Sequence, residues 1–405
     1  MPPTFVNSNS NTYSDKVRGI IDNVIFHQYP SYISSFLKQH LDWCMRGHHD
    51  FGGSHSFFIY NHFFILLHQQ NQNSFAHVSY DEFYQNSENK KYVLNDVNFA
   101  STAKALNLKY ETFRRHRLDL AQEGWFKFGS NTVEFTQKVI EKRKKRNELW
   151  LKSYASYLQS MLKLIEKYFK ITLSISDAKT IEEKLKEHYE RCVLDFSIFT
   201  ATFVSNWTKL FKSFEAYLVF QVIFLNQIRT IEYENDKQGL GLNFDTVQEH
   251  FHDIPPRFAM SATSIADSVG FPRSTITRHL AKLEKKNFVV RLANLDNAGK
   301  VALAKGYPFL YNQNSSEKLQ GDIGAITIET LGGKKSYLIK ADPKSIGNRK
   351  KIREENYRMS IDFLAKQFIR LKLLSEENLE QIATSQTRFL NPSPAYIKSE
   401  TASRK

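Results

Sequence analysis

The dominant pattern along the chain is a helical repeat of apolar side chains. Apolar residues recur every three or four positions over residues 32–41, 158–169 and 361–371, which predicts amphipathic helices packed on a core. Few segments alternate apolar and polar side chains with a period of two. The pattern therefore predicts a mainly α-helical protein with short strands at 125–128, 132–135, 288–292, 325–329 and 336–339.

Two segments far apart in the chain share the same pattern of apolar positions. Residues 103–126 align with residues 266–289 without a gap, and a Thr-x-x-Arg-His string occurs at the same place in both. An apolar, aromatic helix is expected before each segment, over 57–69 and 214–228. We interpret the pattern as an internal duplication of a helical unit that ends in a small head. Chance similarity between two amphipathic helices is the alternative.

The second copy has the residues of two helices joined by a tight turn. Ser261 suits the N-cap of a short helix over 263–268. Gly270 follows, where the turn needs a residue that is free to adopt a positive φ. Pro272 suits the first turn of a second, basic helix over about 272–286.

A β-hairpin is expected directly after this basic helix. Residues 288–292 predict one strand, and residues 300–303 predict the strand that returns beside it. Two helices, a tight turn and a hairpin make a winged helix-turn-helix. Residues 265–280, IADSVGFPRSTITRHL, resemble the DNA-binding heads of bacterial winged-helix transcription regulators of the MarR, IclR and Crp types.

This resemblance implies that the basic helix of the second copy enters a major groove of double-stranded DNA. The side chains expected to face base edges or phosphates are Arg273, Ser274, Thr277 and Arg278. The basic residues expected on the DNA backbone are Lys282, Arg291 and Lys300. For each basic residue alone, a solvated protein surface is the alternative.

The first copy departs from the second at two positions. Asn107 replaces the turn glycine, which is acceptable because Asn visits left-handed conformations. Arg117 replaces an apolar residue. The helix 110–122 is nonetheless strongly basic, and residues 125–135 predict a short wing. We expect this head to bind DNA as well, through Tyr110, Arg114, Arg115 and Lys127. The alternative is that the first head has become a packing module.

These features predict a duplicated architecture flanked by two tails. The expected segments are a flexible tail (1–13), a helical unit (14–150) with the first head at about 95–136, a second helical unit (151–315) with the second head at about 258–305, a C-terminal helical region (316–390) and a flexible tail (391–405). The basic run over 142–146 is expected on a solvated face of a linking helix.

Charge and composition narrow the class of function. The 405 residues carry a net charge of +14, which favours an acidic partner such as nucleic acid. Only two cysteines are present, which favours a reducing compartment. No apolar run reaches the roughly 18 residues of a membrane helix. We therefore expect a cytoplasmic protein that does not bind membranes.

The sequence offers no chemistry that would define an enzyme. It contains no phosphate-binding loop, no nucleophile elbow and no zinc-protease helix motif. His116 and His279 occupy matching positions in the two heads, but no further ligands repeat with them. A packed or phosphate-bonded histidine is favoured, so no metal and no other cofactor is expected.

The function predicted from these features is sequence-specific binding of double-stranded DNA by a bacterial transcription regulator. Two recognition helices in one chain would act as a built-in dimer on half-sites about 34 Å apart, and assembly as a homodimer is left open. One alternative is a plasmid-type replication initiator with tandem winged helices. Another is a structural or protein-interaction role in which the winged helices serve packing.

Overall fold

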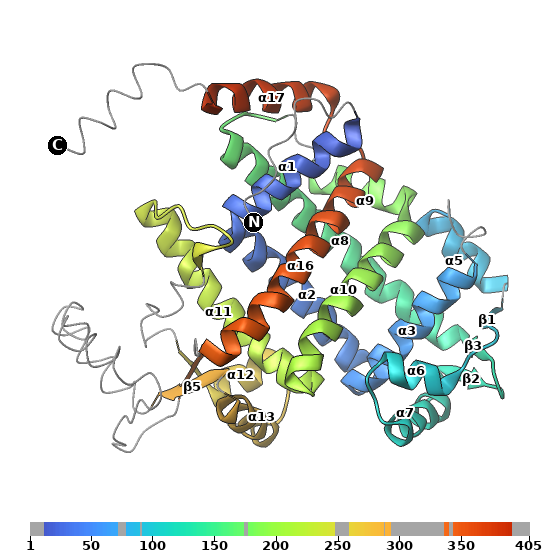
Figure 1. The fold of residues 1–405 in the computed structure, drawn as a ribbon. Helices are drawn as coiled ribbons and strands as arrows, with labels where there is room; N and C mark the ends of the chain where they lie inside the picture. Colours follow the sequence, from blue (N-terminus) through green and yellow to red (C-terminus); the bar gives the residue numbers. More distant parts are fainter. Residues whose placement is uncertain are drawn as a thin grey trace.

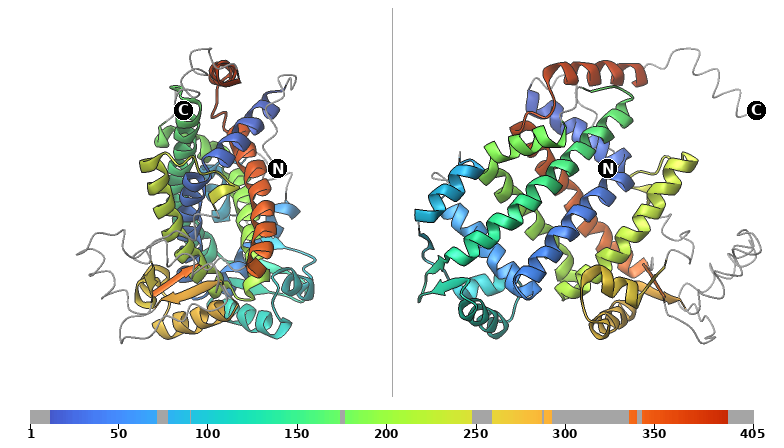
Figure 2. Two further views of the ribbon diagram at one scale, coloured as in Figure 1. Left: turned by 60° about the vertical axis from the view of Figure 1, so that its left-hand side comes forward. Right: turned by 180° about the vertical axis from the view of Figure 1, so that it is seen from behind.

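The computed structural model describes residues 12–71, 78–89, 91–173, 177–247, 259–286, 288–292, 336–339 and 343–390. Within this part, long helices form a bundle, and two small α/β heads lie at the two ends of one edge of it (Figure 1). The view from behind shows the same arrangement (Figure 2). The prediction of a mainly α-helical protein is confirmed.

Among the described residues, the first half of the chain contributes five helices to the bundle. They are α1 (Tyr13–His27), α2 (Tyr29–Asp50), α3 (Ser54–Gln70), α5 (Tyr80–Asn89) and α8 (Gln137–Phe169). The Thr12 hydroxyl accepts a hydrogen bond from the Asp15 amide at 3.3 Å and caps α1. The first helix therefore begins inside the predicted tail 1–13, of which residues 1–11 lie outside the described part.

The second half contributes a matching set. It consists of α9 (Ala178–Glu187), α10 (Tyr189–Phe211), α11 (Phe214–Gln238), α16 (Pro343–Arg370) and α17 (Glu376–Leu390). The predicted boundary between residues 150 and 151 falls inside α8. The predicted boundary at residue 315 and the tail 391–405 lie outside the described residues.

As far as the structure describes it, each head contains two short helices and a three-stranded antiparallel sheet. The first head consists of β1 (Tyr92–Leu94), α6 (Phe99–Ala105), α7 (Tyr110–Gln122), β2 (Phe126–Phe128) and β3 (Val133–Phe135). The second consists of β4 (Met260–Ser261), α12 (Ala262–Val269), α13 (Arg273–Lys285), β5 (Val289–Leu292) and β6 (Ser336–Ile339). The strand orders are β1-β3-β2 and β4-β6-β5, so the same topology occurs twice.

The wing of the second head differs from the predicted hairpin. The strand that pairs with β5 is β6, in the register Val289 opposite Ile339. Residues 300–303, predicted as the returning strand, lie outside the described residues, as do residues 325–329. Although β6 falls in the predicted C-terminal region, it completes the sheet of the second head.

Aromatic rings fill the centre of the bundle. Phe199 of α10 stacks on Phe363 of α16, with ring centroids 4.4 Å apart and planes 4° apart. Trp150 and Tyr154 of α8 both pack on Phe196 of α10 at 5.3 Å. Aromatic pairs of this kind add about 0.5–1.5 kcal/mol each beyond their buried area. The bundle on which the heads are mounted is therefore tightly packed.

The basic run 142–146 does not lie wholly on a solvated face. The Arg143 guanidinium is buried 3.4 Å from the Glu190 carboxylate and lies 3.8 Å from the ring centre of Phe64. Arg146 is also buried and donates to the Tyr60 hydroxyl at 2.7 Å. This part of the prediction is wrong, because α8 turns both side chains toward aromatic rings and polar partners on α3 and α10.

Candidate nucleic-acid interface

The second head forms a helix-turn-helix from α12 and α13. The Ser261 hydroxyl accepts from the Ser264 amide at 3.0 Å, which caps α12 as predicted. Gly270 ends α12 with a φ of 69°, the left-handed conformation that the turn requires. Pro272 has an extended ψ of 139° and is the N-cap of α13, so this helix begins at Arg273. The predicted start is wrong by one residue.

The two faces of α13 differ sharply. Ile276, His279, Leu280 and Leu283 are buried, and α13 packs on α12 of the head and on α11 of the bundle. The outer face is exposed and carries Arg273, Ser274, Thr277, Arg278 and Lys282. Arg273, Arg278 and Lys282 form no ion pair with any residue that the structure describes. Their charges are therefore available to an anionic ligand.

The remaining predicted contacts of this head belong to the wing. Arg291 lies on β5, opposite Tyr337 of β6. Lys300 lies outside the described residues. The Thr277 hydroxyl donates to the Arg273 carbonyl at 3.0 Å, so this oxygen keeps its lone pairs for an incoming donor.

The first head has the same geometry with different residues. Asn98 caps α6 by accepting from the Ser101 amide at 2.9 Å. Asn107 occupies the turn with a φ of 55°, which confirms its predicted left-handed conformation. The guanidinium of Arg117 lies 4.3 Å from the ring centre of Phe99. This cation–π contact explains how an arginine fits where the second head has an apolar side chain.

The basic residues of the first head are partly neutralised by their own neighbours. Arg114 donates two hydrogen bonds to Glu111, at 2.9 and 2.7 Å, and Lys127 lies 2.8 Å from Glu134 on the next strand. These contacts hold the pKa of both carboxyl groups below their usual range. The sequence analysis missed the Glu111 pair, although Glu three residues before Arg on a helix predicts it. Tyr110 and Arg115 are exposed.

The two matching histidines lie on the inner side of the recognition helices instead of facing outward. His279 is buried in α13. His116 is half-buried, with its ring 5.1 Å from that of His55 and Nδ1 3.4 Å from the Ser56 hydroxyl at the start of α3. Burial lowers the pKa of both histidines, so they are neutral at pH 7. No group of three potential metal ligands occurs among the described residues.

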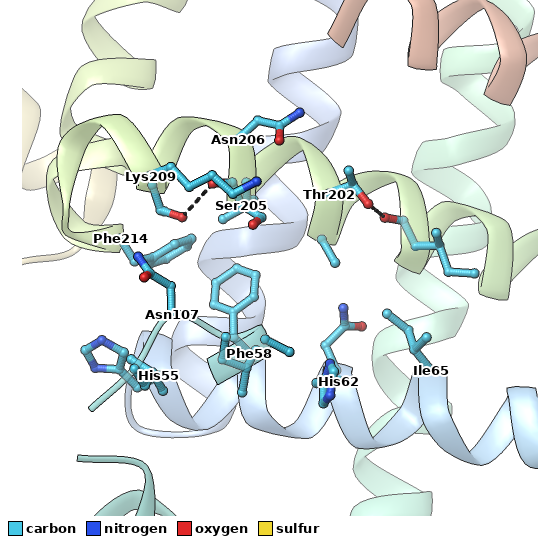
Figure 3. A pocket seen from close by; sticks show the side chains of 18 of the residues that line it. His55, Phe58, His62, Ile65, Asn107, Thr202, Ser205, Asn206, Lys209 and Phe214 are labelled. Atoms are coloured by element: carbon cyan, nitrogen blue, oxygen red, sulfur yellow. Dashed lines mark hydrogen bonds between the residues drawn. The ribbon is translucent and has the colours of Figure 1, made fainter. Parts of the chain in front are cut away.

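A cavity of about 370 Å³ separates the turn of the first head from α10. Phe58 points into it, with the remaining labelled side chains of α3 on one side and those of α10 on the other (Figure 3). Asn107 of the turn lines the same cavity. The first head is therefore mounted on α3, against which α7 and β1 pack.

Comparison with known proteins supports the assignment of the second head as a winged helix-turn-helix. Residues 257–300 match the MarR family. The match covers α12, α13 and β5, and it supports a winged helix-turn-helix of the MarR type at this place. It gives no support to the IclR or Crp types and does not extend to the first head. No curated protein and no solved structure matches the chain.

No helix within the described residues has the length and apolar character needed to cross a membrane.

Proposed function

We propose that the chain is a sequence-specific DNA-binding transcription regulator that carries two winged-helix heads. The observation that carries this proposal is the exposed basic face of α13, which has no acidic partner among the described residues and belongs to the segment similar to the MarR family. The net charge of +14 favours the same partner. No catalytic group and no cofactor is required.

The duplication of the head is part of this proposal. Its support is that both heads have the order strand, helix, helix, strand, strand, and that each sheet places its last strand in the middle. The elements before the heads also correspond, since α2 and α3 precede the first head as α10 and α11 precede the second. The two units then comprise residues 13–169 and 178–370.

In the proposed mechanism α13 inserts into the major groove, which is wide enough for one helix. The planar guanidinium of Arg278 donates hydrogen bonds to a guanine edge, and Arg273 and Lys282 contact flanking phosphates. Ser274 and Thr277 bond to base or phosphate. The buried face of α13 fixes the helix on the head, so these side chains are presented in one orientation.

The first head binds the same duplex through Tyr110 and Arg115 of α7. Arg114 and Lys127 contribute to binding by exchanging their carboxylate partners for DNA phosphates. Because that exchange leaves Glu111 and Glu134 near the phosphates, the first head contributes less to affinity than the second. One chain supplies both heads, so binding requires no second copy.

The proposal is tested by recovering sheared DNA from the source genome with the purified chain at near-physiological salt, followed by sequencing. Sharp peaks at promoters that share a motif support a regulator. Peaks on short direct repeats at an origin would instead favour a replication initiator, an alternative that gains no support from the family match. The Arg278→Glu variant is the matched control. Equal recovery by both proteins would leave the heads with a packing role and overturn the proposal.

A further inference from the structure

The two halves of the bundle exchange equivalent contacts. By their order around the heads, α1 corresponds to α9, α2 to α10, α3 to α11 and α8 to α16. In the bundle α1 packs on α16 and α9 packs on α8, while α2 packs on α11 and α10 packs on α3. These four contacts between the halves thus form two reciprocal pairs. This reciprocity is the mark of a two-fold axis, because head-to-tail repeats use two different surfaces.

Contacts between single residues are reciprocal in the same way. Aligning Tyr29, the first residue of α2, with Tyr189, the first of α10, also aligns the starts of α3 and α11 without a gap. This alignment places Phe36 on Phe196 and Trp43 on Phe203. The structure contains both crossed pairs, each edge to face: Phe36 with Phe203 at 5.0 Å, and Trp43 with Phe196 at 5.6 Å. The halves therefore meet about an approximate two-fold axis.

Both recognition helices lie along the edge of the bundle that this axis crosses. Three views place α7 and α13 on that edge, one at each side (Figures 1 and 2). Two heads related by a two-fold axis meet one duplex equivalently only if that axis coincides with a dyad of the DNA. Direct repeats are related by a screw movement along the duplex, which a two-fold axis does not produce.

From this symmetry we propose that one copy of the chain recognises an inverted repeat with two unequal half-sites. The proposal rests on the proposed function, because it takes both heads as DNA-binding. The two half-sites are expected to share one contact with the protein, since Arg115 of α7 and Arg278 of α13 occupy corresponding positions and both are exposed. The recognition helices differ at the neighbouring positions, where the first head has the ion pair of Glu111 and Arg114 and the second head has Ser274 and Thr277.

The test is repeated selection of duplexes from a randomised library of about four helical turns with the full chain. The expected motif is two half-sites in inverted orientation, with one base pair in common at equal distance from the dyad. Two half-sites in direct orientation, or a single half-site, would overturn the inverted repeat while leaving DNA binding intact. No enrichment at all would overturn the proposed function itself.

Two variants assign the half-sites. Arg115→Ala and Arg278→Ala are each expected to weaken binding to the selected duplex by about 5- to 150-fold and to remove the base preference in one half only. Arg191→Ala is the control. It removes an exposed arginine at the start of α10, a helix of the bundle, and is expected to leave affinity unchanged. Light scattering of the complex should give one chain per duplex. Two chains per duplex, or loss of the same half in both variants, would contradict the proposal.

Discussion

At the scale of single residues, the two recognition helices differ in how their arginines are held. Arg114 is engaged by Glu111, whereas Arg278 has no acidic partner among the described residues. An ion pair this exposed contributes little to stability, because solvent and salt screen it. Its main effect is to cancel charge where DNA would lie.

Removing Glu111 should therefore improve binding. We expect Glu111→Ala to raise the affinity for the selected duplex and to steepen the slope of log affinity against log salt by up to about 0.9, because the Glu111 carboxylate no longer offsets the charge that Arg114 brings to its phosphate contact. Titrations at several salt concentrations measure both quantities. Glu380→Ala, on the exposed side of α17, is the control for the change in net charge. Identical slopes for the two variants would exclude Arg114 from the interface.

A buried histidine predicts how stability depends on pH. His40 of α2 faces α11, with Nε2 2.5 Å from the Tyr217 hydroxyl, and burial lowers its pKa from 6.5 to about 3. The folded state therefore favours the neutral ring, and the unfolded chain binds a proton below pH 6.5. Stability contributed by His40 is full above pH 6.5 and is lost as the pH falls toward 3.

This linkage amounts to about 2 kcal/mol between pH 7 and pH 5 for one such group. We expect His40→Gln, which cannot be protonated, to lose about that much less stability than the wild type over the same interval. Urea unfolding at the two pH values gives the difference within each protein. An equal loss in both proteins would mean that His40 is protonated in the folded state.

At the scale of elements, local signals predicted both helix-turn-helix segments. The cap at Ser261 and the turn at Gly270 act within a few residues of the helices they define, so they can be recognised in the sequence. The strand at 336–339 was predicted, but its pairing with β5 in the second head was not, because residues 293–335 come between the two strands. The burial of Arg143 could not be foreseen either, because its carboxylate partner Glu190 belongs to a distant helix.

The turn between the helices gives a matched pair of variants. Gly270→Ala should destabilise the fold by about 1–2 kcal/mol, because φ is 69° there and alanine is strained in that region. Crowding adds little, since the nearest atom to the new Cβ is Met45 Cε at 3.9 Å. Asn107→Gly in the first head should be close to neutral. Chemical unfolding of both variants checks this, and equal losses would show that strain at φ is not the cause.

At the scale of the whole molecule, the bundle holds two heads on one edge and fixes their relative orientation. The aromatic pairs around Phe36 and Phe196 join the two halves directly, so the heads are held as one body. The sequence indicated a duplication through the shared Thr-x-x-Arg-His string. It could not show that the halves face each other, since that follows from contacts such as α1 with α16 and α2 with α11, which join helices separated by more than a hundred residues.

The central claim is that both recognition helices occupy one duplex at the same time. Hydroxyl-radical footprinting of the full chain on the selected duplex tests it most directly. The account predicts two protected patches on one face of the DNA, with centres about 34 Å or a multiple of that distance apart. Arg278→Ala should weaken one patch more than the other. A single protected patch, unchanged in its extent by Arg115→Ala, would contradict the account.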